Sequence, residues 1–172
     1  GRTLSRALAA VGDAGLVCCA DVDEAASEQA AEYGYSRRYA DYGEMLYREE
    51  LDGVVVALPH YMLAGAAIAA AEAGCHIFLE KPFARDRADA DKRVEAIRRN
   101  KVKVQLAHQM RRSPFVRRVR AMIEAGEIGS MQELRCRGKE DRRAGGEDLM
   151  VLGSHLCDMS RYFLGDPRWV FA

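Results

Sequence analysis

Apolar residues along most of the chain occur either at helical spacing or in short continuous runs. Continuous apolar runs predict buried strands of a parallel sheet. Such runs lie at residues 16–20, 52–59, 75–79 and 102–107, and a short extended piece is predicted near Arg38 and Tyr39. Helical spacing predicts helices at 4–11, 23–33, 62–73, 86–100 and 114–125, with a short helix after Asp41. Strands that alternate with helices predict an α/β fold, with helices on both faces of a parallel sheet.

The pattern changes after Gly129. Residues 130–139 alternate like an exposed antiparallel strand, residues 140–148 are polar, and residues 151–163 again have helical spacing. The change predicts the opening of a second domain. The first helical pattern begins at once, without Met, and residues 169–172 resemble a strand that is just starting. We therefore expect a fragment that is cut at both ends.

Charge is balanced, with 26 Lys and Arg against 26 Asp and Glu in 172 residues. No global field therefore recruits nucleic acid or anionic lipid, and small molecules are the expected partners. The basic residues of one helical segment cluster at Arg111, Arg112, Arg117, Arg118 and Arg120. This cluster is nearly free of aromatic residues and is followed by Glu124 and Glu127, so we interpret it as a solvated or interface helix face, with no nucleic-acid partner.

The cysteines and histidines indicate a reducing setting without a metal centre. Five cysteines are an odd number, four of them sit among apolar neighbours, and no C-x-x-C is repeated, so we expect reduced core thiols and a cytoplasmic protein. The four histidines have no close ligand spacing, which argues against a metal site. No apolar run reaches the roughly 18 residues that a membrane span requires, although an export signal upstream of Gly1 stays open.

Polar residues follow several predicted strands, where a doubly wound sheet binds its ligands. Asp21 ends the first of these strands, and Gly1 lies 20 residues before it. In a dinucleotide-binding fold an acid at this place accepts hydrogen bonds from the adenosine ribose, about 20 residues after the last glycine of the fingerprint. The alternative is an Asp that merely keeps a strand end soluble. If Asp21 binds the ribose, the cofactor is expected to be NAD rather than NADP, because Val22 and Asp23 follow it and no arginine does.

Lys81 stands at another strand end, between Glu80 and Pro82. Proline restricts its own backbone and that of its predecessor, so the lysine has a fixed direction. Its amine would hydrogen-bond a substrate hydroxyl and support proton loss as hydride leaves. The alternative is a surface Glu-Lys pair in a turn.

His155 lies near the start of the last predicted helix, with Asp158 and Tyr162 roughly one turn apart on it. A histidine and an aspartate at this spacing interact on a helix surface. A histidine oriented by a carboxylate is a general-base candidate because it titrates near working pH. The alternative is a structural histidine.

Four segments, "DGVVVALP", "AAEAGCHIFLEKPFA", "QMRRSPFVRRVRAMIEAGEIG" and "GGEDLMVLGSHLCDMSRYFLGDP", resemble the glucose-fructose oxidoreductase, inositol dehydrogenase and rhizopine-catabolism (Gfo/Idh/MocA) family. The resemblance implies a Rossmann-type parallel sheet, with its first strand missing, over residues 1–110. It implies the start of an α+β substrate domain over residues 111–172, and a homo-oligomer when full length. The implied reaction is reversible hydride transfer between NAD, with NADP as an alternative, and a hydroxyl carbon of a carbohydrate or polyol.

The resemblance also assigns roles to single residues. Lys81 becomes the catalytic lysine that bridges nicotinamide ribose and substrate, and His155 becomes the acid/base residue. The cofactor side is expected to include Gly1, Arg2, Asp21, Leu58, Pro59, His60, Glu80 and Gln109. Arg111 and Asp148 join Lys81 and His155 as expected substrate contacts.

The chain departs from the family pattern at two positions that we expect to be functional. Val151 replaces an Asp four residues before the histidine, and Leu63 replaces a histidine four residues after Pro59. These departures keep two other hypotheses open. One is a glycosidase that oxidises C3 transiently and eliminates the aglycone while recycling NAD. The other is a non-catalytic binding or regulatory protein on the same fold.

Overall fold

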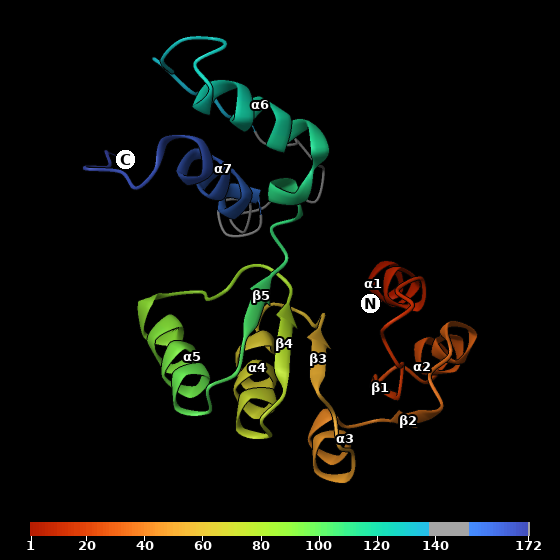
Figure 1. Cartoon of the computed structure of the whole chain (residues 1–172). Helices are drawn as coiled ribbons and strands as arrows, with labels where there is room; N and C mark the ends of the chain where they lie inside the picture. Colours follow the sequence, from red (N-terminus) through yellow and green to blue (C-terminus); the bar gives the residue numbers. More distant parts are fainter. Residues whose placement is uncertain (138–151, 172) are drawn as a thin grey trace. The chain divides into compact units, whose positions relative to one another are not determined.

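The computed structural model describes residues 1–137 and 152–171. The chain divides into two compact units, Gly1–Leu106 and Ala107–Ala172 (Figure 1). The first unit contains, in order, α1 (Arg2–Ala9), β1 (Cys18–Ala20), α2 (Glu24–Ala30), η1 (Ala31–Tyr33), β2 (Arg37–Tyr39), α3 (Tyr42–Arg48), β3 (Gly53–Val56), α4 (Leu63–Glu72), β4 (His76–Leu79), α5 (Arg87–Arg99) and β5 (Val104–Leu106). The second contains η2 (Gln109–Arg112), α6 (Pro114–Glu124) and α7 (Ser154–Leu164).

All the strand pairs of the first unit are parallel, which confirms the predicted α/β class. β1 pairs with β2, and β4 lies between β3 and β5. A doubly wound sheet has the order 3-2-1-4-5-6. In that order, β2 and β1 correspond to strands 3 and 2, and β3, β4 and β5 correspond to strands 4, 5 and 6. Strand 1 of such a sheet would lie between β1 and β3. Within each ladder the strands are parallel, so the carboxyl ends of β3, β4 and β5 lie at one edge of their sheet.

Alanine makes the main helix-to-sheet contact of the first unit. The buried face of α4 consists of Leu63 and of Ala66, Ala67, Ala70 and Ala71. These residues form one cluster with Val56 of β3 and with Ile77 and Leu79 of β4. Small side chains allow the helix backbone to approach the sheet closely, and interiors packed this densely resist displacement. The contact therefore fixes β3 and β4, whose carboxyl ends carry the candidate site.

Aspartate begins three helices of this unit. The side chains of Asp23, Asp41 and Asp86 accept hydrogen bonds from backbone amides in the first turns of α2, α3 and α5. An aspartate at this position satisfies amides that have no partner within the helix. The helix starts predicted at these aspartates are confirmed. The end of the helix predicted at residues 23–33 is also confirmed, because Gly34 follows it with a φ of 98°, which glycine adopts without strain.

The strand predicted at residues 130–139 is wrong over the part that the structure describes. Residues 131–137 form no regular element, and residues 169–171, which resembled a strand start, form none either. A strand requires a neighbour to share its backbone hydrogen bonds. Within residues 107–137 and 152–171 there is no other strand to pair with. Alternating polarity shows which face a strand would bury, but it does not supply that neighbour.

The cysteines follow the prediction of core thiols only in the first unit. Cys75 is buried and Cys18 and Cys19 are half-buried, whereas Cys136 and Cys157 are exposed. Burial raises the pKa of Cys18 to about 11 and also raises the pKa of Cys75, so both thiols are protonated at neutral pH. The core interpretation is wrong for Cys157, because apolar neighbours in sequence do not decide which helix face a residue occupies. None of the helices in the described ranges combines the length and apolarity needed to cross a membrane.

Candidate functional site

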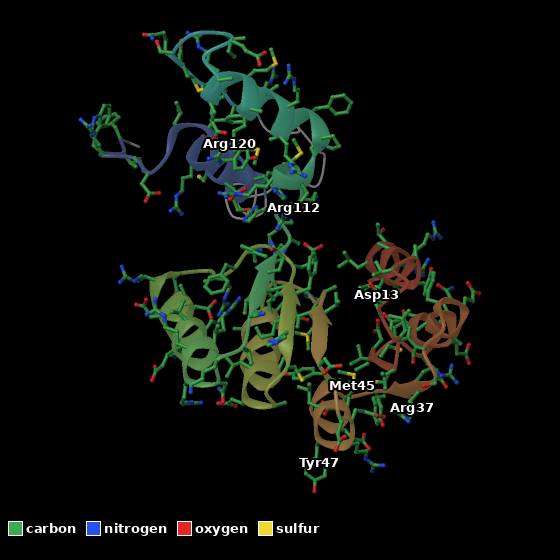
Figure 2. The ribbon with its side chains drawn as sticks, in the orientation of Figure 1. Asp13, Arg37, Met45, Tyr47, Arg112 and Arg120 are labelled. Atoms are coloured by element: carbon green, nitrogen blue, oxygen red, sulfur yellow. The ribbon has the colours of Figure 1, made fainter. Side chains whose placement is uncertain are left out.

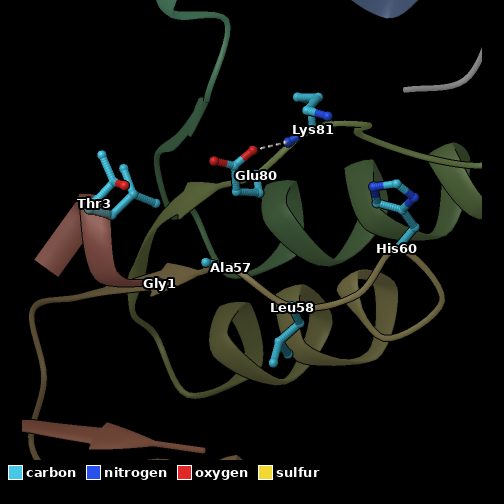
Figure 3. Close-up of a pocket in the computed structure, with 8 residues that line it drawn as sticks. Gly1, Thr3, Ala57, Leu58, His60, Glu80 and Lys81 are labelled. Carbon is cyan, nitrogen blue, oxygen red and sulfur yellow. Dashed lines mark hydrogen bonds between the residues drawn. The ribbon is translucent and has the colours of Figure 1, made fainter. Parts of the chain in front are cut away.

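A cavity of about 300 Å³ lies at the carboxyl ends of β3 and β4 (Figure 3). Ala57 and Leu58 directly follow β3, and Glu80 and Lys81 directly follow β4. Among the residues that the structure describes, the lining consists of Gly1, Thr3, Leu4, Ala57, Leu58, His60, Glu80 and Lys81. Because ligands of doubly wound sheets bind at this edge, the cavity lies where a cofactor site is expected.

Backbone hydrogen bonds set the position of Lys81. The amide of Glu80 donates to the carbonyl of Val56 at 2.9 Å, which extends the ladder between β3 and β4 by one residue. The amide of Lys81 then donates to Oε2 of Glu80 at 3.2 Å, the contact drawn in Figure 3. The peptide bond between Lys81 and Pro82 is cis. Lys81 therefore leaves the sheet from a fixed point, with Glu80 turned back toward its backbone.

The N-terminus of α1 supplies the other wall of the cavity. Gly1 is the N-cap of this helix, and Thr3 and Leu4 lie in its first turn. The first amides of a helix have no partner within the helix, and its N-terminus favours negative charge. This wall can therefore hold an anion such as a pyrophosphate. Sequence reasoning chose Gly1 but missed Thr3, Leu4 and Ala57, although helical spacing from residue 4 already indicated a helix end here.

Several predicted cofactor residues do not line the cavity. Arg2 and Pro59 are exposed beside residues that do line it. Asp21 directly follows β1, as predicted, and is exposed. Its Oδ1 accepts the amide of Asp23 at 3.0 Å, and its own amide donates to the carbonyl of Tyr39 at 3.1 Å. These bonds hold the carboxylate at the strand end, and its role toward a ribose stays a prediction.

A second group of polar side chains is centred on Asp158 in the second unit. Nε of Arg111 donates to both carboxylate oxygens of Asp158 at 2.9 Å, and Nη2 is 2.8 Å from Oδ1. The Nδ1 atom of His108 is 3.9 Å from Oδ2 of the same carboxylate. The structure pairs Arg111 with a carboxylate 47 residues away in sequence, and its contact with substrate stays a prediction. Its described contacts support a role in fixing Asp158.

The ring of Tyr162 connects this group to α6. The guanidinium carbon of Arg111 lies 5.1 Å from the ring centroid, and that of Arg120 lies 4.3 Å from it. Nη1 of Arg120 also donates to the backbone carbonyl of Tyr162 at 3.0 Å, and Figure 2 labels this arginine on α6. Arginine stacked on an aromatic face stabilises the contact by about 0.5–2 kcal/mol, depending on exposure. Arg120 of the basic cluster therefore serves the packing of α6 against α7.

His155 lies in the first turn of α7 and is half-buried. Its ring meets that of His108 edge to face, with the centroids 5.3 Å apart and the planes at 90°. His108 lies two residues after the end of β5, close to the edge where ligands of such sheets bind, and this position is the signal that would have identified it. Gln109 is the first residue of η2 and is exposed. Asp148 and Val151 lie outside the described residues.

Ion pairs engage further members of the basic cluster. Arg118 pairs with Glu127 at 3.3 Å, and Arg120 pairs with Glu124 at 2.7 Å. The exposed Arg118 pair fits the solvated part of the predicted solvated or interface helix face, and Arg120, which also contacts Tyr162, fits the interface part. Within residues 1–137 and 152–171, no three or more His, Cys, Asp or Glu side chains gather as metal ligands would.

Comparisons with known proteins agree with this arrangement. Residues 1–108 match the family model described as "Oxidoreductase family, NAD-binding Rossmann fold", and residues 116–172 match the model of the GFO/IDH/MocA C-terminal domain. The levoglucosan dehydrogenase of Pseudarthrobacter phenanthrenivorans is 30% identical, over 83% of this chain and 40% of that protein. The inositol 2-dehydrogenase of Rhizobium meliloti is 29% identical, over 96% of this chain and 52% of that protein.

A solved structure has the same fold. The scyllo-inositol dehydrogenase of Lactobacillus casei, crystallised with NAD(H) and scyllo-inositol, matches with a TM-score of 0.88 and 22% identity. The match covers 96% of this chain and 53% of that one. The chain thus spans about half the length of the proteins that it matches. The chain belongs to the Gfo/Idh/MocA family of oxidoreductases, whose N-terminal domain is an NAD-binding Rossmann fold.

Proposed function

We propose that the protein is an NAD-dependent oxidoreductase that transfers hydride between nicotinamide and a hydroxyl carbon of a sugar, cyclitol or related polyol. The observation that carries the proposal is the cavity in which Lys81 and the N-terminus of α1 meet at the ends of β3 and β4. The names of the relatives, a levoglucosan dehydrogenase and an inositol 2-dehydrogenase, support this substrate class. In this proposal residues 1–110 form the cofactor domain, and residues 111–172 begin the substrate domain.

The lining of the cavity fits the cofactor. The first-turn amides of α1, around Thr3 and Leu4, would bind a pyrophosphate. Asp21 would accept hydrogen bonds from the adenosine ribose hydroxyls, as an acid at the end of this strand does in dinucleotide folds. Leu58, His60 and Glu80 would border the nicotinamide end. A bound nicotinamide would supply the hydride acceptor.

The catalytic steps then belong to two side chains. The amine of Lys81 would donate a hydrogen bond to the reacting hydroxyl and stabilise the negative charge that develops on its oxygen. His155 would take the hydroxyl proton as hydride leaves the same carbon, and would return it in the reverse reaction. Arg111 would hold Asp158 in place, as their paired hydrogen bonds suggest.

Turnover by the full-length gene product tests this function. With NAD and a panel of inositols, aldoses and levoglucosan, the absorbance of reduced nicotinamide is expected to rise with at least one substrate. If no sugar or polyol supports cofactor reduction, the proposal is wrong. Free sugar released from a glycoside with no net reduced nicotinamide would instead indicate the elimination reaction.

Asp21→Asn is expected to weaken NAD binding by about tenfold and to narrow the preference for NAD over NADP. A hydrogen bond to a charged group is worth about 1.5–3 kcal/mol, and the carboxylate repels a 2′-phosphate. Titration with NADH and with NADPH, followed by the fluorescence of the reduced nicotinamide, measures both effects. Asp52→Asn removes the same charge just before β3, at the opposite edge of the sheet, and serves as the control. Equal losses in the two variants would contradict the assignment of Asp21.

A further inference from the structure

Arg93 is a buried cation in the middle of α5. Only 1% of its surface is exposed, and it is one of the largest fully buried side chains among the described residues. Transfer of a guanidinium out of water is costly unless hydrogen bonds compensate for it. Burial lowers the pKa of Arg93, while the neighbouring Asp89 carboxylate raises it. Such a residue requires a structural reason for its charge, because an apolar side chain would fill the same space without this cost.

The contacts of Arg93 converge on the segment that leaves the candidate site. Its Nη1 donates to the backbone carbonyl of Phe83, and its Nη2 donates to Oδ2 of Asp89 at 2.8 Å. The guanidinium also lies over the ring of Phe83, with its carbon 5.7 Å from the centroid. One side chain of α5 therefore holds both the backbone and the ring of a residue only two positions after Lys81.

Asp89 extends this connection to the next residues. Its Oδ2 accepts the backbone amide of Arg85 at 3.1 Å, in addition to Nη2 of Arg93. The Oδ1 atom of Asp86 accepts the amide of Asp89 at 2.8 Å, as the N-cap of α5. Phe83, Arg85 and Asp86 are thus each bonded to the helix that follows them. A segment tied at three points has little freedom to move independently of α5.

Lys81 lies between this anchor and the sheet. On its N-terminal side, the amide of Glu80 is bonded to the carbonyl of Val56 at 2.9 Å. On its C-terminal side, the first anchor is the carbonyl of Phe83. The ring of Phe83 packs against the core formed by β3, β4 and α4. The backbone direction at Lys81 therefore depends on Arg93 as well as on the strand.

We infer that Arg93 is a positioning residue for Lys81, acting through the carbonyl of Phe83 and through Asp89. The inference rests on the proposed function for Lys81, because position matters only if its amine meets the substrate. A displacement of about 1 Å at a reacting group lowers the rate by about a hundredfold. Arg93 would therefore affect kcat without touching substrate or cofactor.

Hydrogen exchange on the full-length gene product without cofactor tests the structural part. Arg93→Met keeps an unbranched apolar side chain in the buried site but removes all the hydrogen-bond donors of the guanidinium. Exchange of the amides at residues 83–89 is expected to rise by about tenfold, since each lost charge-assisted bond is worth at least that factor. The strand at residues 76–79 is expected to be unchanged. Unchanged exchange at 83–89, or an equal rise in both segments, would overturn the inference.

Steady-state kinetics of the same variants test the link to Lys81. Arg93→Met is expected to lower kcat by about tenfold to a hundredfold while changing the KM for NAD less than threefold. Arg87→Met is the matched control, because Arg87 forms an exposed i,i+4 pair with Asp91 on the same helix at 2.9 Å. Its pair contributes little in water, so neither readout is expected to change. A normal kcat in Arg93→Met, with faster exchange at 83–89, would overturn the link to Lys81.

Arg93→Lys keeps the inference testable if the methionine variant fails to fold. Lysine retains the charge but reaches Phe83 or Asp89 rather than both. Intermediate values of exchange and kcat are expected, and wild-type values of both would contradict the inference. If the wild-type protein turns over no substrate, the proposed function fails. The exchange result would still decide whether Arg93 fixes the segment.

Discussion

Lys81→Ala is expected to lower kcat by about a hundredfold to a thousandfold in the full-length protein. Removal of one preorganised hydrogen-bond donor from a developing oxyanion has an effect of this size. Lys81 has no redundant partner in the cavity lining, because no other lysine or arginine of the described residues belongs to it. The measurement is steady-state reduction of NAD at saturating substrate, with the KM for NAD determined in parallel.

Two variants control for indirect effects at Lys81. Lys92→Ala removes an exposed lysine from α5 without approaching the cavity lining, and is expected to keep the wild-type rate. Lys81→Arg keeps the charge with a different shape, and is expected to restore little activity because a planar fork does not replace a compact ammonium group. Wild-type kcat in Lys81→Ala would leave the cavity without a catalytic lysine and would favour the non-catalytic hypothesis.

His155→Asn is expected to lower kcat by about a hundredfold to ten-thousandfold, the range that general acid–base catalysis supplies. Asparagine retains a polar side chain at the position but cannot accept the substrate proton as imidazole does. The kcat of the wild-type protein should rise with pH as the base loses its proton. This rise should be absent from the pH profile of the variant. A pH profile of kcat between mildly acidic and mildly alkaline conditions measures both effects.

His76→Asn is the control for His155. This histidine is exposed at the start of β4, at the opposite edge of the sheet, and its Nδ1 accepts the amide of Lys103 at 3.2 Å. Asparagine can accept the same bond, so the rate and its pH profile should be unchanged. A pH limb that survives in His155→Asn would assign the base elsewhere, and His108, whose ring meets that of His155, would be the first residue to test.

Local sequence patterns were sufficient to predict most of the first unit. The β-branched run within residues 52–59 and the apolar run at residues 75–79 each predicted a parallel strand, and helices were predicted to begin at Asp23, after Asp41 and at Asp86. Because the carboxyl ends of parallel strands share one edge, the ends of these two predicted strands were expected to lie together. The family resemblance then assigned Leu58 and Lys81 to this place. Both line the cavity.

Long-range pairing limited prediction in the second unit. Arg111 and Asp158 are separated by 47 residues, and nothing in either segment indicates that one will bind the other. The same limit applies to His108 and His155, which are brought together only by the fold. The burial of Arg93 could not be predicted for a different reason. Helical spacing shows on which face of α5 the residue lies, but it gives no reason to expect a charged side chain to be buried there. Local patterns report propensity and face, whereas partners depend on tertiary structure.

The alanine face of α4 also bears on how this sequence can vary. Ala67, Ala70 and Ala71 are at most 1% exposed, so a larger side chain at any of them would move the helix away from β3 and β4. Such a movement would displace the strand ends that carry Leu58 and Lys81. Natural variants of the protein would therefore carry fewer substitutions on this face of α4 than at exposed positions. Pro59 is such an exposed position, because it adjoins the cavity but does not line it.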